Sequence, residues 1–172
     1  LGGFRVRAAV QQAIGARSGH PYPASTPPEA RPNSFNSTME IENMTMSIDE
    51  GAVMRHLEKL VALKTRYSYS PQIKTAAEYI RGVFESCGLD VQYHDYLSGA
   101  REMKNVIATL KGANASAPAY YLGAHYDSTS GTPYYDAPGA DDDGTGTAAV
   151  MAAAEVLSHY RFNRSIVFCA FS

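Results

Sequence analysis

The sequence predicts an α/β fold, a three-layer sandwich in which helices flank a mixed, partly parallel sheet that is incomplete at the C-terminus. Two observations carry this prediction. An apolar strand over 119–124, an alanine-rich helix over 144–160 and a second apolar strand over 165–171 follow one another in the order of a βαβ unit. The last strand does not alternate polar and apolar residues, which indicates that both of its faces are covered, as in parallel sheets.

Residues 1–45 are predicted to lie outside this fold, as a disordered segment or one that resembles a pro- or transit segment. Five prolines punctuate the stretch 21–32. Proline interrupts regular structure because its ring fixes φ and removes a backbone donor. The folded part is therefore expected to be 46–172.

Two amphipathic helices are predicted at the start of this folded part. Ser47 and Glu50 form a capping box, and apolar residues then recur at helical spacing over 48–64. The second helix covers 71–87, with Pro71 at its start and Gly88 as its stop.

A pair of strands is predicted to follow, over 89–97 and 105–111, with a Ser-Gly-Ala turn between them. The β-branched and aromatic residues of these runs, and the turn, favour a hairpin-like pair. In an α/β sheet the functional groups collect at the carboxyl ends of the strands. Here those ends are residue 125 onward and residue 172 onward.

The bulk composition argues against two classes of partner. The formal net charge is only −2, with acids and bases mixed along the chain, so no nucleic-acid partner is expected. No apolar run approaches the roughly 20 residues that span a bilayer, so no membrane partner is expected either. The sequence says nothing about oligomeric state.

Other features bear on secretion and on whether the chain is a fragment. Four Asn-x-Ser/Thr sites favour the secretory pathway, although no signal peptide opens the chain. These sites are Asn36, Asn43, Asn114 and Asn163. The first residue is Leu1 and the last apolar strand has nothing after it, so the chain is expected to be a fragment. Cys87 and Cys169 are predicted to be buried thiols.

The first candidate for chemistry is His125-Tyr-Asp127, directly after the strand over 119–124. Residues two apart on an extended chain point to the same side, so His125 and Asp127 can cooperate. A histidine that binds a metal usually donates its other ring N–H to a carboxylate. By itself the pattern is more typical of a surface histidine beside an acid.

The second candidate is the acidic loop 137–146, which contains Asp141, Asp142 and Asp143 ahead of the alanine-rich helix. Three adjacent acids repel one another unless they are solvated or hold a cation. A solvated turn that caps the helix is the alternative interpretation. A calcium loop of the EF-hand type is excluded, because its first and last positions would be Gly139 and Val150, and neither side chain can bind calcium.

Taken together, GAHYDS, APGADDDGTG, AAVMAAAEVL and IVFCAFS resemble the co-catalytic zinc exopeptidases of the secreted bacterial leucyl aminopeptidase type. The resemblance covers 47–172 and is strongest after Tyr120. It implies that the chain carries the N-terminal part of a zinc-dependent aminopeptidase domain, with peptides as substrates.

The resemblance also implies the roles of individual residues. His125 would bind one of two zinc ions, Asp142 would bridge both, and Asp127 would orient His125. The peptide bond between Asp142 and Asp143 would be cis. The family's glutamate base and remaining ligands would lie beyond Ser172, so the chain alone is expected to be inactive.

Two other functions remain open. The chain could instead resemble a glutaminyl cyclase-like aminoacyltransferase, an enzyme with the same fold. It could also be a catalytically inactive relative that keeps the scaffold for binding only. No Gly-x-Ser-x-Gly elbow or phosphate-binding glycine loop supports a serine hydrolase or a nucleotide-binding protein. His20, His56 and His94 have no such context and are expected to face solvent.

Overall fold

The computed structural model describes residues 38–172. Their elements follow in the order α2 (Thr38–Met46), α3 (Glu50–Val61), α4 (Gln72–Ser86), β1 (Asp90–Ser98), β2 (Arg101–Leu110), β3 (Tyr120–His125), the π-helical turn η1 (Ala140–Gly144), α5 (Thr145–Leu157) and β4 (Ile166–Phe171). Every helix and strand predicted from the sequence is present, with ends shifted by a few residues.

The four strands form one mixed sheet in the order β1-β2-β4-β3. β1 pairs with β2, and β2 with β4, in the antiparallel sense, whereas β3 and β4 are parallel and α5 connects them. The predicted hairpin and βαβ unit are therefore confirmed, and so is the mixed, partly parallel sheet. Gly99 makes the hairpin turn with a φ of 62°, a conformation that glycine adopts at no steric cost.

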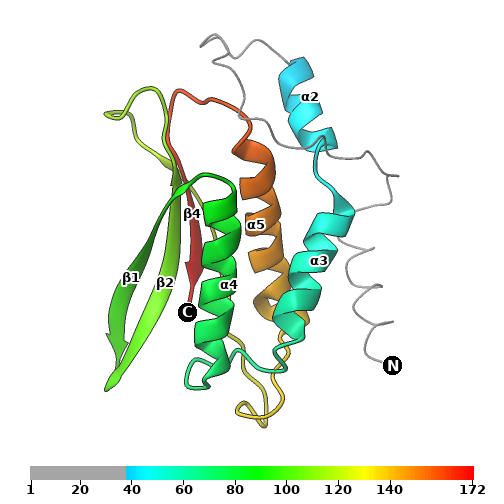
Figure 1. The fold of residues 1–172 in the computed structure, drawn as a ribbon, viewed down its shortest axis with the longest axis vertical. Coiled ribbons are helices and arrows are strands. Elements are labelled where there is room, and N and C mark those ends of the chain that lie inside the picture. The colour runs from blue at the N-terminus through cyan, green and yellow to red at the C-terminus, as the bar shows by residue number, and fades with distance from the viewer. Residues whose placement is uncertain (1–37) are drawn as a thin grey trace.

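Helices α4 and α5 pack against the sheet, and α3 packs on α5 beyond it (Figure 1). The core lies between these helices and the sheet, where Leu60, Ile80, Phe84, Val106 and Phe168 are fully buried. This packing covers the apolar faces that the helical periodicity predicted. Within residues 38–172, no helix is long and apolar enough to cross a membrane.

The start of the fold differs from the prediction. Helix α2 occupies Thr38–Met46, so the last part of the segment 1–45 is helical, while 1–37 lie outside the described residues. Asp49 caps α3 by accepting a hydrogen bond from the Gly51 N–H at 2.9 Å. The predicted Ser47 cap is wrong, because the Ser47 hydroxyl instead donates to the Asn43 carbonyl at the end of α2.

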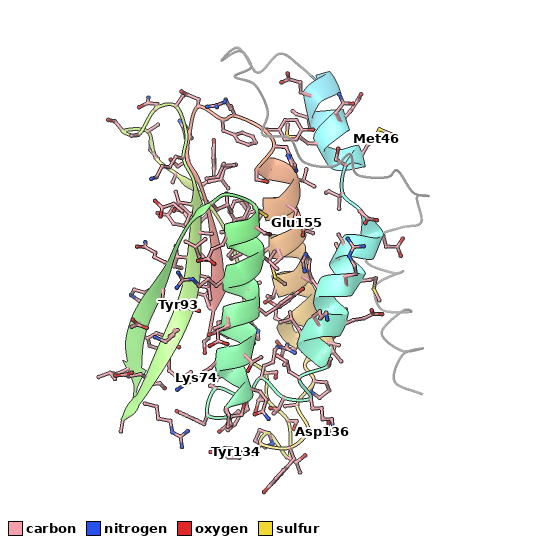
Figure 2. All side chains as sticks on the ribbon, in the orientation of Figure 1. Met46, Lys74, Tyr93, Tyr134, Asp136 and Glu155 are labelled. Carbon is pink, nitrogen blue, oxygen red and sulfur yellow. The ribbon has the colours of Figure 1, made fainter. Side chains whose placement is uncertain are left out.

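His56 also differs from the prediction. Its side chain is buried, with Nδ1 2.7 Å from the Tyr79 hydroxyl and Nε2 3.2 Å from Oε1 of Glu155, which is labelled in Figure 2. These partners come from α4 and α5, so the charges around His56 on its own helix could not indicate its burial. His94 is exposed, as expected, and His20 lies outside the described residues.

The two cysteines are free thiols. Cys169 is buried, as predicted, whereas Cys87 at the end of α4 is half-buried. Burial raises the pKa of the Cys87 thiol to about 11 and also raises the pKa of the Cys169 thiol. Both groups are therefore protonated and unreactive at neutral pH.

Candidate metal centre

The carboxyl ends of β3 and β4 lie side by side. His125, the last residue of β3, is in register with Phe171, the last residue of β4. The loop after β3, in which Figure 2 labels Tyr134 and Asp136, lies at the same end of the molecule as the C-terminus (Figure 1). This loop leads into η1 and α5, so the two motifs noted in the sequence meet at one sheet edge.

His125 and Asp142 face each other across this edge. Nε2 of His125 lies 3.0 Å from Oδ1 of Asp142. Two atoms at this separation can both lie about 2.0 to 2.2 Å from a common point, the distance at which zinc binds imidazole nitrogen and carboxylate oxygen. The Asp142 side chain is 86% exposed, which leaves the pair open to solvent and to a ligand. The two donors are therefore of the kinds that zinc binds and are close enough to share one ion with further ligands.

Asp127 contacts the other nitrogen of the same imidazole. Nδ1 of His125 lies 3.3 Å from Oδ1 of Asp127 and 3.2 Å from its backbone carbonyl oxygen. The second oxygen of this carboxylate accepts a hydrogen bond from the Ser68 hydroxyl at 2.7 Å. Donation from Nδ1–H to Asp127 leaves the Nε2 lone pair directed at Asp142, the tautomer that a metal ligand needs.

The site favours positive charge. Burial by itself would lower the pKa of His125, but the Asp127 backbone hydrogen bond and the carboxylates of Asp127, Asp143 and Asp142 outweigh it and raise this pKa. The same groups would stabilise a metal cation at the same position, because a cation among anions gains Coulomb energy wherever water is partly excluded.

Asp143 has a role that the sequence did not reveal. Its carboxylate accepts hydrogen bonds from the backbone N–H of His125 at 3.2 Å and of Gly146 at 3.0 Å. The Thr147 hydroxyl donates to the His125 carbonyl at 2.8 Å. The end of β3 is thus bound to the start of α5 from both sides. The Asp142–Asp143 peptide bond is cis, which confirms the prediction.

Residues from outside the two motifs complete the surroundings, and no local signal in the sequence distinguished them. Ser68 and the buried Arg66 come from the segment between α3 and α4. At the end of β4, the backbone N–H of Ser172 donates to Oδ1 of Asn105 at 3.0 Å, and the Tyr96 hydroxyl donates to the Ser172 carbonyl. These contacts fix the backbone directly after β4.

Within the part of the chain that the structure describes, no group of three or more His, Cys, Asp or Glu side chains is arranged to hold a metal ion. His125 and Asp142 therefore form a pair of candidate ligands. Zinc in proteins takes about four ligands, so further donors are needed for a stable site.

Comparison with known proteins identifies relatives. Residues 105–172 match the model of peptidase family M28. The chain is 27% identical to a probable zinc metalloprotease of Pyrenophora tritici-repentis over 157 residues, which cover 77% of this chain and 36% of that protein. It is 29% identical to leucine aminopeptidase 1 of Trichoderma harzianum over 129 residues, 71% of this chain and 32% of that protein. The chain thus spans about a third of the length of these relatives.

Solved structures share the fold. LapA of Legionella pneumophila superposes with a TM-score of 0.68 at 22% identity, over 80% of this chain and 39% of that chain. A glutaminyl cyclase of Fimbriiglobus ruber superposes with a TM-score of 0.65 at 21% identity, over 83% of this chain and 49% of that chain. Both likenesses concern the arrangement of helices and strands.

Proposed function

We propose that this chain belongs to the M28-type zinc exopeptidases and that its full-length protein is a zinc-dependent aminopeptidase. It would remove N-terminal residues from peptides, and residues 46–172 would be the N-terminal part of its catalytic domain. The observation that carries the proposal is the 3.0 Å approach of His125 Nε2 to Asp142 Oδ1 at the carboxyl edge of the sheet. The relatives named leucine aminopeptidase support the choice among peptidases.

In this proposal the chain's own residues would contribute to a site for two zinc ions. His125 would bind zinc through Nε2, and Asp142 would be a ligand shared by the two ions. Asp127, fixed by the Ser68 hydroxyl, keeps the proton of His125 on Nδ1. When bound, zinc would polarise the scissile carbonyl and lower the pKa of an attacking water molecule. Asp143 would hold the end of β3 against the start of α5 through its hydrogen bonds to the His125 and Gly146 N–H groups, and so keep both ligands in place.

The test of function compares two substrates of the full-length protein, leucine p-nitroanilide and its N-acetylated form. The free amine is expected to be required, so only the first should be hydrolysed. 1,10-Phenanthroline should remove the activity, and added zinc should restore it. Chelator-resistant hydrolysis, or equal cleavage of the acetylated substrate, would contradict the proposal.

Aminoacyl transfer of the glutaminyl cyclase kind is the alternative, since a solved cyclase shares the fold. A peptide with N-terminal glutamine distinguishes the two reactions. Release of free glutamine supports the aminopeptidase, whereas formation of pyroglutamate without cleavage supports the cyclase. A folded protein that hydrolyses neither this peptide nor leucine p-nitroanilide and forms no pyroglutamate would be a binding scaffold.

We extend the proposal to a secretory route, supported by three Asn-x-Ser/Thr sites in the described residues: Asn43 on α2, which is exposed, and the neighbouring pair Asn114 and Asn163. Asn114 and Asn163 are exposed, and the Asn114 N–H donates to the Asn163 carbonyl at 2.9 Å. Both lie before the amino ends of β3 and β4, at the opposite end of these strands from His125. Glycans there would leave the carboxyl edge of the sheet accessible.

The native protein is expected to lose apparent mass on treatment with peptide N-glycosidase F in ¹⁸O water. Mass spectrometry should then find the heavy-oxygen label of glycan removal at Asn114 and Asn163. Asn105, which is followed by Val and Ile, is an internal control that should stay unlabelled. Unmodified peptides at both sites would argue against the secretory route.

A further inference from the structure

Arg66 is a buried cation in the segment between α3 and α4, and its side chain is among the fully buried ones. Its guanidinium donates to four backbone carbonyl oxygens, those of Tyr126, Leu60, Pro138 and Gly139. Burial lowers the pKa of Arg66 to about 10, against the opposing effect of the Asp127 and Asp143 carboxylates. The group is therefore charged at neutral pH, and its charge lies close to the candidate metal centre.

Three of the four carbonyl partners of Arg66 belong to the segments that carry the candidate ligands, and the fourth, Leu60, lies on α3. Nε donates at 2.7 Å to Tyr126, which lies between His125 and Asp127. Nη1 and Nη2 donate at 2.6 Å and 2.9 Å to Pro138 and Gly139, directly before η1, which contains Asp142. The planar guanidinium group of Arg66 thus connects the end of β3 to the start of η1 through hydrogen bonds.

The backbone of Arg66 strengthens the same connection. Ser128 Oγ accepts a hydrogen bond from the Arg66 N–H at 3.0 Å and donates one to the Ala137 carbonyl oxygen at 2.6 Å. The Ser128 N–H donates at 3.1 Å to the Arg66 carbonyl. The loop after β3 is therefore bound to Arg66 through both its side chain and its backbone.

Two glycines make room for the guanidinium. A Cβ placed on Gly139 would lie 3.1 Å from Nη2 of Arg66, and one on Gly144 would lie 3.2 Å from it. These glycines flank Asp142 on either side within the chain. The backbone that presents Asp142 is thus packed closely against the charged fork.

From these contacts we infer that Arg66 is a positioning residue for the metal centre. Its fork sets the separation between His125 and Asp142 and so raises the affinity of the pair for zinc. Lysine cannot replace it, because an ammonium group is a point donor and cannot reach carbonyls that lie in several directions in one plane. The inference rests on the proposed function for the identity of the metal.

The experiment compares the full-length protein with Arg66→Lys and Arg66→Gln, using zinc as the probe. Competition with a chromogenic chelator gives the zinc Kd, and thermal unfolding of the metal-free and zinc-loaded forms gives the zinc-dependent rise in Tm. Both variants are expected to bind zinc about 10–100-fold more weakly, the usual cost of losing a group that orients a metal ligand. Their zinc-dependent rise in Tm should shrink accordingly.

Arg55→Lys and Arg55→Gln are matched controls, because this side chain is 66% exposed and makes a single 3.5 Å contact with Asp49. Both controls should keep the zinc Kd of the unmodified protein. If the Arg66 variants do not fold, Ser128→Ala tests the same connection, and its zinc Kd is expected to rise several-fold.

Three outcomes would overturn the inference. The first is an unchanged zinc Kd in Arg66 variants whose metal-free Tm has fallen, since that describes a purely structural residue. The second is an unchanged zinc Kd in Ser128→Ala where the Arg66 variants cannot be measured. The third, no zinc binding by the unmodified protein, would overturn the proposed function itself, so the two failures are distinguishable.

Discussion

Asp142→Asn is expected to abolish the chelator-sensitive peptidase activity that we propose for the full-length protein. The substitution keeps the shape of the side chain but replaces an anionic oxygen that faces His125 Nε2 at 3.0 Å with a neutral amide. Losing a residue that only orients a ligand weakens metal binding about 10–100-fold. Losing the proposed bridging ligand should therefore weaken zinc binding by more than about 100-fold, which a zinc Kd and kcat/KM would both record.

Asp141→Asn is the matched control, because it removes the same charge one residue away. Its side chain is exposed, and its backbone carbonyl accepts from Thr145. Zinc binding and activity should be preserved in this variant. Asp127→Asn should fall between the two, with a loss of about 10–100-fold. Equal losses in Asp141→Asn and Asp142→Asn would contradict the assignment of Asp142 as a ligand.

Phe168→Ala is expected to lower the free energy of unfolding by about 3–5 kcal/mol. Phe168 lies in the interior strand β4, is fully buried, and packs with its ring centroid 6.1 Å from that of Phe84 on α4. Truncation removes buried apolar surface and leaves a cavity that the packed sheet cannot close. A domain of ordinary stability has about 5–15 kcal/mol in total, so urea unfolding followed by circular dichroism should show a large shift in midpoint.

Phe171→Ala provides the comparison on the same strand. Its side chain is 44% exposed, so the same chemical change removes less buried surface. We expect less than half the loss seen for Phe168→Ala. A similar loss for both variants would mean that burial in the described core does not decide the stability of this strand.

The sequence alone determined the elements and the two motifs that contain the candidate ligands. Helical spacing of apolar residues, the stop at Gly88 and the hairpin turn near Gly99 are local signals, since they depend on residues a few positions apart. The βαβ order then placed the loops after 124 and 171 at one sheet edge, because parallel strands end at the same side. The two motifs were accessible to prediction as one site because both lie at the end of the strand that finishes at residue 125 or in the segment that follows it.

Tertiary structure alone decided which other residues surround the site. Arg66 and Ser128 are 62 positions apart in the chain, and Arg66 and Gly139 are 73 apart. His56 likewise meets Glu155 across 99 positions. Such contacts form only when separate elements pack together, so the local sequence around an arginine or histidine does not indicate whether it is buried. The family resemblance had singled out Asp142 among the three acids, but only the path of η1 shows the physical difference between them: it turns Asp142 toward His125 and Asp143 toward the start of α5.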